Sequence, residues 1–561
     1  LPRPRTRSAA EPEKSYKLGL RRLDVLLMAA VTAVYAVAAF VNLGDTKAPQ
    51  TEWVSTTPGE EVIFDLGQER TFIFTYYGGI SSTNFDVSFS SDGETWTEPV
   101  TALYDQGQIF RWLWLNESGA TTTARYARIT VNTSTASPTS ALAPLRLREV
   151  GFLDENGEPL PVASVTSSLP ETSAQSAGFD ENGVWTEDSG FAFTDAEGNA
   201  DAALSPADPD LLIDEQDVVP AYPSYLNSTY FDEIYHARTA YEQIHYDEFD
   251  SAYEWTHPPL GKTLMMIGIE LFGMTPFGWR FMGALMGVLM LPVMYLLVKQ
   301  LTKRTDLSCI AMFLLAVDAM HFTQTRIATI DSYVVLFIMV MYLFMFRYSQ
   351  MRWRRDGFAR SLVPLGLSGL FMGIAWAAKW VGIYGSAGLV VIFFWTLWKN
   401  VRIEMRLTKA HRQARHVRLT RRALRAGKRT RTVKTVNLVW RRNGRMQVLT
   451  LHSGVPVSRR ATADARGAVC PAPRPLGVTL FAGLWVGMLL ALISGAAAAL
   501  DVSGLLALST SFFGSALRLL ARGWVAGLCV GAAVAAASLA LLCRVERSYL
   551  RRVGVLSAFC V

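Results

Sequence analysis

A series of long apolar runs constrains the fold of this chain more than any other feature. The first run, at about 24–43, is long enough to cross about 30 Å of hydrocarbon as a helix. Further runs lie at about 276–298, 308–322, 332–346, 362–378, 382–398, 476–499 and 523–543. Half of the residues are hydrophobic and only 18% are charged. We therefore expect a polytopic α-helical membrane protein that also has a soluble part.

Basic residues predict the orientation of these spans. Seven Arg and Lys residues lie in 1–23, before the first span, which places the N-terminus in the cytoplasm by the positive-inside rule. Alternating the spans from there puts the basic clusters 299–304, 347–355 and 399–460 inside as well. It puts 44–258, the 322–331 turn and the turn after Lys379 outside. The competing interpretation of the first run is a cleaved signal peptide, although the run is long for one.

The expected outer region begins with a β-rich stretch. Residues 48–160 alternate polar and apolar side chains, as in 61–67 and 125–130, and Asp-Gly and Asn-Gly turns interrupt them. This pattern predicts a β-sandwich inserted in the first outer loop. Trp112 and Trp114 either stack on sugar faces or belong to the core. Residues 161–225 lack periodicity and are expected to form a linker.

The predicted outer region contains no cysteine, so we expect neither a disulfide framework nor a zinc site of the usual spacing there. The segment 399–475 is basic, and within 399–460 Glu404 is its one acidic residue. Its charge either sets topology on a solvated helix or contacts anionic lipid of the bilayer. No interleaved aromatic platform supports RNA binding, so no nucleic acid partner is expected.

Ionisable residues gather at the outer ends of the predicted spans. A charge at the centre of a bilayer costs roughly 2.5–3.5 kcal/mol or more, so charges in or beside hydrocarbon usually persist for a functional reason. The set comprises Asp232, Glu233, His236, His257, Lys262, Arg280, Asp318, His321, Arg326, Asp331 and Lys379. Such clustering on one side of the membrane is typical of an enzyme site.

Several members of this set leave alternatives open. The adjacent carboxylates of Asp232 and Glu233 can provide a general base, ligate a divalent cation, or simply begin a helix. Arg280 either binds phosphate through its planar fork or extends to the interface. The charges around the 322–331 turn can also satisfy one another.

Together these residues resemble the protein O-mannosyltransferase family of GT-C glycosyltransferases. The matching phrases are FDEIYHA, HPPLGKTLMMIGIELFG, WRFMGALMGVLMLPVMYLL, DAMHFTQTRIATIDSYVVLF and AAKWVGIY, within about 230–395. The resemblance implies that Asp232, next to Glu233, is the base and that Arg280 is the family's arginine on the following span. In the β-rich stretch, the phrases DLG, SxDGxTW and ARYxRIT resemble a discoidin-type (F5/8C-like) galactose-binding module, and a glycan is therefore a candidate ligand there.

From the family resemblance we expect Arg280, Lys262 and His257 to bind the donor phosphate. The expected supporting residues are His236, His321, Arg326, Asp331 and Lys379. No cofactor is expected, apart from the option of a divalent cation at Asp232 and Glu233. The inserted module departs from the family pattern, and so does the chain beyond about 400. Residues 440–561 would be a divergent C-terminal half, a truncated one or a frame-shifted one.

The resemblance implies an inverting transferase of the cell membrane. It would move a sugar, with mannose expected, from a polyprenyl-phosphate carrier to Ser or Thr of an exported protein. The alternatives are a lipid or cell-wall glycan as acceptor, and a non-enzymatic sugar-binding receptor. A transporter is disfavoured because the charges lie at one face instead of the midplane.

The expected order is a basic N-terminus (1–23), a first span (24–43), the sandwich (48–160), a linker (161–225), the catalytic loop and spans (226–398), the basic segment (399–475) and further spans (476–561).

Overall fold

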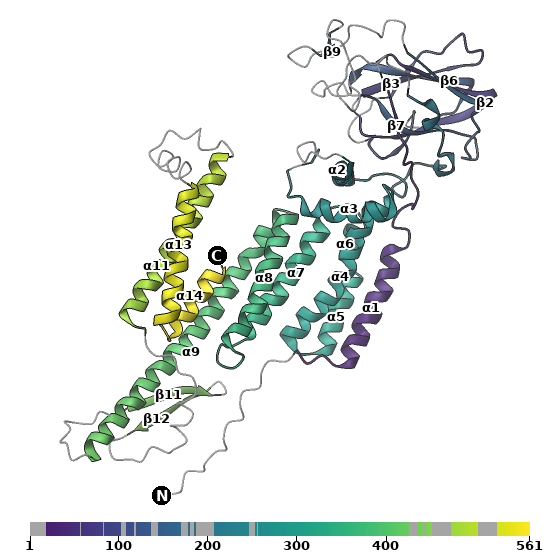
Figure 1. The fold of residues 1–561 in the computed structure, drawn as a ribbon. Helices are drawn as coiled ribbons and strands as arrows, with labels where there is room; N and C mark the ends of the chain where they lie inside the picture. Colours follow the sequence, from purple (N-terminus) through teal and green to yellow (C-terminus); the bar gives the residue numbers. More distant parts are fainter. Residues whose placement is uncertain are drawn as a thin grey trace. The chain divides into compact units, whose positions relative to one another are not determined.

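A computed structural model of the protein describes most of the chain. The described residues are 18–56, 58–81, 83–102, 108–116, 119–135, 144–169, 178–179, 185–186, 207–245, 253–254, 256–425, 436–442, 445–451, 473–502 and 524–560. They fall into two compact units. One unit comprises Leu20–Met339 and Met372–Tyr384, and the other comprises Leu1–Gly19, Val340–Phe371 and Gly385–Val561. Figure 1 traces the elements of both units along the chain.

The described residues include seven helices that are long and apolar enough to cross a membrane. They are α1 (Arg22–Phe40), α4 (Pro276–Thr302), α7 (Asp331–Gln350), α8 (Phe358–Ala378), α9 (Val381–Arg425), α11 (Pro475–Val502) and α13 (Trp524–Val545). A bent pair, α5 (Thr305–Ala316) and α6 (Ala319–Thr325), makes eight if it forms one span. Each predicted run coincides with one of these elements, so the polytopic α-helical fold class is confirmed.

The run predicted at 308–322 is broken because a polar residue caps a helix inside it. Asp318 is the N-cap of α6, and its carboxylate accepts a hydrogen bond from His321 N at 2.7 Å. Such a cap satisfies one of the free N–H groups at a helix start and favours a new helix there. The axes of α5 and α6 consequently differ by 58°.

Beyond the span of α9, this helix continues to Arg425. A hairpin of β11 (Val436–Arg442) and β12 (Arg445–Leu451) follows in the described residues. Part of the basic segment is therefore a helix, and both alternatives for its charge stay open. The basic residues before position 18, on which the predicted orientation depends, lie outside the described residues.

An antiparallel β domain follows α1, as predicted. Its main path is β1 (Trp53–Val54), β7 (Arg146–Leu153), β2 (Glu61–Gly78), β6 (Thr122–Thr135), β3 (Thr83–Ser90) and β4 (Val100–Ala102). The long strand β2 pairs with β6 along its first half and with β7 along its second half, and a register shift separates Asp65 from Arg70. Gly67 in this shift has a φ of +75°, which glycine adopts without a steric cost. The long strand thus has two groups of partners around an aromatic core.

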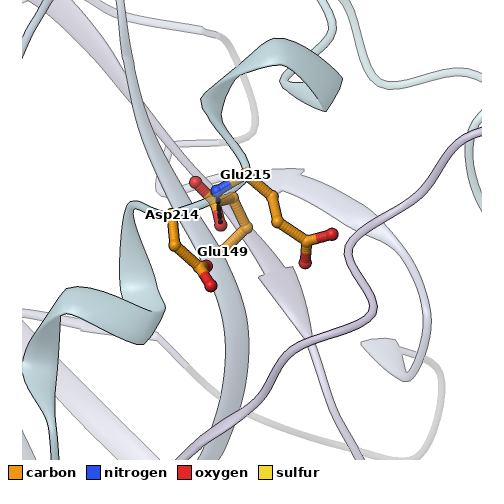
Figure 2. Close-up of side chains that lie close together, drawn as sticks. All are labelled: Glu149, Asp214 and Glu215. Atoms are coloured by element: carbon orange, nitrogen blue, oxygen red, sulfur yellow. Dashed lines mark hydrogen bonds between the residues drawn. The ribbon is translucent and has the colours of Figure 1, made fainter.

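The domain includes residues that were expected to form a linker. Strand β8 (Ser164–Ser168) pairs with β2, and the short helices η2 (Pro209–Leu212) and η3 (Gln216–Val218) pack on β7. A polar cluster fastens this segment, because Gln216 Nε2 donates to Glu149 at 2.5 Å and Glu215 accepts from Thr51 N at 3.0 Å. In addition, Glu215 N donates to Glu149 Oε2 at 3.2 Å (Figure 2). These contacts have no signature in the composition of 161–225, which explains why the linker prediction missed them.

Of the two tryptophans considered for sugar stacking, Trp112 is buried in the domain core. Only 1% of its surface is exposed, and its ring meets that of Tyr77 edge-on at 5.2 Å. Trp114, on the same strand β5 (Trp112–Trp114), is half-buried and packs near Tyr222, with ring centroids 6.2 Å apart. The core alternative therefore holds for Trp112. The resemblance to a discoidin-type module stays a prediction.

Hydrogen bonds join the β domain to the segment that leads into α2 (Glu233–His245) within the same unit. Trp112 N donates to Ser228 Oγ at 3.0 Å, and Thr229 N donates to Phe110 O at 3.1 Å. Arg148, which is 1% exposed, donates to Tyr241 Oη of α2 at 2.8 Å. The β domain thus holds the start of α2 in place.

Candidate active site

The two adjacent carboxylates at the start of α2 have opposite environments. Glu233 is fully buried, whereas Asp232 is half-buried. Glu233 closes its own turn, because its Oε2 accepts from Tyr230 N at 2.9 Å and its N–H donates to Tyr230 O at 3.2 Å. The turn therefore directs one carboxylate into the protein and leaves the other at the surface.

Arg280 is bound to Glu233 by two parallel hydrogen bonds. Its Nε donates to Oε1 and its Nη2 donates to Oε2, each at 2.6 Å. The other contacts of the guanidinium are Nη1 to Leu43 O and Nη2 to Ser228 O, each at 3.1 Å. Four of its five N–H donors are thereby used, and its side chain is only 3% exposed. In this structure the guanidinium is occupied by Glu233 and two backbone oxygens, and the expectation that it binds donor phosphate stays a prediction.

The beginning of α4 positions this arginine. Thr275 caps the helix by accepting from Gly278 N at 3.0 Å, and Pro276 occupies the first helical position, where its missing N–H costs nothing. Arg280 follows within the next turn, where it faces Glu233. The register of the cap thus determines the direction of the guanidinium.

Two glycines on α4 bring a third segment to the same carboxylate. A Cβ on Gly283 would lie 3.2 Å from Thr325 O, and one on Gly287 would lie 2.6 Å from the Thr325 side chain. Glycine at both positions permits this close approach. The turn after α6 then places Ala328 N at 2.9 Å from Glu233 Oε1. Each oxygen of Glu233 thus accepts two hydrogen bonds, one of them from a cation, which leaves no lone pair for a metal ion shared with Asp232.

Asp232 is available for chemistry. Its carboxylate forms no hydrogen bond or ion pair with the residues that the structure describes. Its backbone oxygen accepts from Tyr235 N at 3.2 Å and from His236 N at 3.1 Å, which fixes the main chain. A fixed backbone with a free carboxylate is the arrangement that a general base needs.

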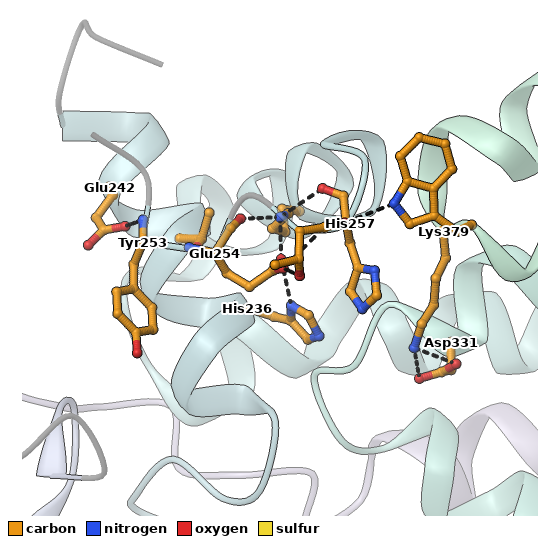
Figure 3. A network of polar contacts seen from close by, with 11 residues as sticks. His236, Glu242, Tyr253, Glu254, His257, Asp331 and Lys379 are labelled. Atoms are coloured by element: carbon orange, nitrogen blue, oxygen red, sulfur yellow. Dashed lines mark hydrogen bonds and ion pairs between the residues drawn. The ribbon is translucent and has the colours of Figure 1, made fainter. Parts of the chain in front are cut away.

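A second buried charge pair holds the loop before α3 (Leu260–Phe272). Lys262 is 1% exposed and donates to both the carboxylate and the backbone oxygen of Glu254, each at 2.5 Å. Figure 3 shows Glu254 together with His236 and His257. Burial alone would raise the pKa of the Glu254 carboxyl, but the hydrogen bonds from Lys262 and Thr256 lower it to about 2. This lysine of α3 is therefore a structural cation that holds the preceding loop, and its geometry does not favour the prediction that it binds donor phosphate.

Two of the three histidines of the set lie beside that pair. His236 Nδ1 is 3.9 Å from Glu254 Oε2, and burial lowers the pKa of its imidazole to about 4 despite this carboxylate. His257 is half-buried, with its ring centroid 6.3 Å from that of His236. At neutral pH His236 is therefore uncharged and can be packed inside the loop.

Lys379 and Asp331 form a third pair that remains accessible. Lys379 Nζ donates to both oxygens of Asp331, at 2.9 and 2.8 Å. The Asp331 side chain is 45% exposed and that of Lys379 is 19% exposed. The next residue, Trp380, donates from Nε1 to Thr256 O at 2.8 Å, which joins this pair to the loop of Glu254 and His257.

His321 and Arg326 connect α6 to α1. The His321 ring stacks on Tyr35 at 5.4 Å, and Arg326 Nη2 donates to Val41 O at 2.8 Å and to Asn42 O at 2.5 Å. These contacts fix the end of α1 against the 325–328 turn that reaches Glu233. Their supporting role in the site stays a prediction.

Sequence reasoning missed two charged partners. The pattern does not single out Glu254, because this residue lies in a loop without periodicity, eight residues before Lys262. The sequence indicates Lys299 as a cytoplasmic topology signal, whereas it is buried and donates to Asp24 at 2.7 Å. The one available signal was Asp24 itself, an acidic residue at the start of an apolar run.

One group of acidic residues has ligand atoms close enough to hold a metal ion among the described residues. Oxygens of Glu149, Asp214 and Glu215 lie within 4.8 Å of one another. Burial raises the pKa of the Glu149 carboxyl to about 9, so this group is protonated at neutral pH.

Part of the chain is similar to a known family of proteins. Residues 269–421 match the family model described as dolichyl-phosphate-mannose-protein mannosyltransferase. A polyprenol-phosphate-mannose–protein mannosyltransferase of Mycolicibacterium smegmatis is 31% identical over 190 residues, which cover 31% of this chain and 36% of that protein. The protein of the same name in Mycobacterium tuberculosis is 32% identical over 183 residues, or 29% of this chain and 34% of that protein. The chain therefore spans about a third of the length of these curated relatives.

Among solved structures, a Saccharomyces cerevisiae protein O-mannosyltransferase complex bound to the sugar donor matches at 22% identity, with a TM-score of 0.27. The match covers 30% of this chain and 25% of that one.

Proposed function

We propose that this chain, which carries the domain of the dolichyl-phosphate-mannose-protein mannosyltransferase family over residues 269–421, transfers mannose to proteins. The donor would be a polyprenyl-phosphate-mannose, and the acceptor a Ser or Thr hydroxyl of an exported polypeptide. One observation supports this most strongly. A free carboxylate, Asp232, stands on a turn that the buried Glu233–Arg280 pair holds rigid.

In the proposed reaction Asp232 acts as the general base. The acceptor oxygen bonds to the anomeric carbon while its proton passes to an Asp232 oxygen, and the bond from that carbon to the phosphate oxygen breaks with its electron pair. The polyprenyl phosphate leaves with the added negative charge. A single displacement without a covalent intermediate inverts the anomeric centre. Positioned bases of this kind contribute roughly 10²–10⁴-fold in rate.

We assign the leaving phosphate to Lys379, with His257 nearby, in place of Arg280 and Lys262. Arg280 and Lys262 are buried and fully engaged with carboxylates, so phosphate would have to displace a buried partner. The partner of Lys379 is half-exposed, and a phosphate can share or replace it at lower cost. A cation that is already in place would stabilise the charge that develops on the leaving group.

A lipid-linked donor requires a site at the membrane surface. We propose that the N-terminus is cytoplasmic and that Asp232 and the β domain lie outside the cell membrane, because this arrangement puts the basic clusters inside. A glycan ligand of the β domain stays a prediction, and it would need a surface other than the buried Trp112.

Membranes that contain the full chain provide the test. They would be incubated with labelled polyprenyl-phosphate-mannose and a Ser/Thr-rich polypeptide. Label on the polypeptide that alkali releases by β-elimination supports the proposal. Label confined to lipid or to glycan would replace the acceptor by one of the alternatives, and no transfer at all would favour the receptor.

A further inference from the structure

Aromatic side chains remain exposed on the segment that ends at Asp232. Tyr230 is 55% exposed and Phe231 is 62% exposed. Their backbone is not loose, because Thr229 N donates to Phe110 O at 3.1 Å and Tyr230 N donates to Glu233 at 2.9 Å. Fully burying such a ring stabilises a protein by roughly 1.5–3 kcal/mol. The fold leaves this stabilisation unused at two consecutive positions beside the proposed base.

Phe231 also has an unfavourable backbone conformation. Its φ is +55°, in the left-handed region that a bulky side chain rarely adopts and that costs roughly 1–2 kcal/mol. Glycine adopts this conformation without the penalty. Of the ring contacts among the described residues, the one of Phe231 is with its neighbour Tyr230, at 6.4 Å between centroids. A strained residue whose side chain adds little to packing points to a role outside folding.

The proposed chemistry determines which substrate this ring can meet. In an inverting displacement the acceptor oxygen lies between the base and the anomeric carbon, and the phosphate leaves from the opposite face. A side chain directly beside the base therefore borders the acceptor. The donor phosphate lies beyond the sugar, on the side that we assign to Lys379.

We propose that Phe231, with Tyr230, forms the surface that receives the acceptor polypeptide beside its Ser or Thr. This proposal rests on the proposed function. The ring contacts an apolar side chain that flanks the acceptor hydroxyl, and the neighbouring Asp232 carboxylate repels acidic flanking residues. Phe231 is thus a specificity-determining residue, and its left-handed backbone directs the ring outward while Glu233 turns inward.

Three variants separate the ring from the backbone. Phe231→Gly keeps the left-handed turn and removes the ring, Phe231→Tyr keeps the ring, and Phe231→Ala removes the ring while retaining the strain. Tyr222→Ala removes an exposed ring of the same segment further from Asp232 and is the matched control. Transfer would be measured with two peptides that differ only in a Leu or a Gly next to the Ser.

The expected result is a rise of about tenfold in the KM for the Leu peptide in both Phe231→Gly and Phe231→Ala. This rise corresponds to the loss of one ring contact of about 1.4 kcal/mol. The KM for the Gly peptide and for the donor should stay at wild-type values, as should all constants of Phe231→Tyr and Tyr222→Ala. The unfolding temperature of Phe231→Gly should not be lower than that of the wild type.

Other outcomes overturn the proposal. If the KM of Phe231→Gly for the Leu peptide equals that of the wild type, the ring does not contact the acceptor. Its exposure would then serve contact with the bilayer interface. A raised donor KM would place the ring on the sugar side. If the wild type transfers label but the variants change neither the KM for the Leu peptide nor the KM for the donor, the proposed acceptor surface is wrong. The proposed function would still stand. If the wild type transfers nothing, both are wrong.

Discussion

The stability losses caused by replacing Glu233 and Arg280 one at a time should, when added, exceed the loss caused by replacing both together. Arg280→Met leaves a carboxylate that is fully buried without its cation. Glu233→Gln leaves a guanidinium that is 3% exposed without its anion. Removing one partner of a buried pair costs about 3–5 kcal/mol, because the remaining charge stays out of water. We expect this loss for each single variant.

The double variant should be more stable than the sum of the two losses implies. When both substitutions are combined, no buried charge is left without a partner, and the loss is confined to hydrogen bonds. Residues in contact usually show coupling of about 0.5–3 kcal/mol, and the two 2.6 Å hydrogen bonds place this pair at the upper end. Arg280→Lys should also be destabilised, because a single ammonium cannot replace the fork or reach both Leu43 O and Ser228 O.

The measurement is denaturant unfolding of the full chain in detergent. It gives the free energy of unfolding of each variant relative to that of the wild type. The transfer activity of the same preparations shows whether loss of the pair also displaces Asp232. Losses that add within about 0.5 kcal/mol would refute the reasoning, because they would mean that the two side chains are not coupled. An Arg280→Lys variant as stable as the wild type would refute the role of the fork.

Three further predictions concern other parts of the chain. Burial raises the pKa of Glu149 to about 9 from an ordinary 4.5. Its contribution to stability is therefore present below pH 4.5 and is lost as pH rises through 9. Glu149→Gln should flatten the fall in unfolding temperature over this window. A Cβ at Gly531 would lie 2.6 Å from the backbone of α11. Gly531→Leu should therefore cost about 1–3 kcal/mol and lower the unfolding temperature. Gly369→Ala should not lower it, because the space around Gly369 is open. A membrane-impermeant thiol reagent should label a cysteine introduced at Gln68, an exposed position on β2, in intact cells but not one at Arg422, and labelling at Arg422 would contradict the proposed orientation.

The sequence was sufficient for the parts of the fold that depend on local patterns. Apolar runs at 276–298 and 332–346 became α4 and α7, because a helix that spans a membrane satisfies its own backbone. Alternation at 61–67 became the start of β2. The break at Asp318 was not predicted, although a capping residue inside an apolar run carries the necessary signal.

The pairing of charges could not be read from the sequence. Arg280 and Glu233 are 47 residues apart, and only the tertiary fold brings them together. Arginine in a span suggests an anionic ligand, and the anion here is a side chain of the same chain. The same applies to Lys262, whose partner Glu254 lies in a loop without periodicity. In both cases the residue type was informative, but the identity of its partner had no signature in the sequence.

The transfer rate of Asp232→Asn tests the central claim most directly. Because this carboxylate has no partner among the described residues, its replacement by an isosteric amide should leave folding and donor affinity unchanged, unlike any change at Glu233. The account predicts a loss of roughly 10²–10⁴-fold in the rate of mannosyl transfer at an unaltered unfolding temperature. Turnover close to that of the wild type would show that Asp232 is not the base.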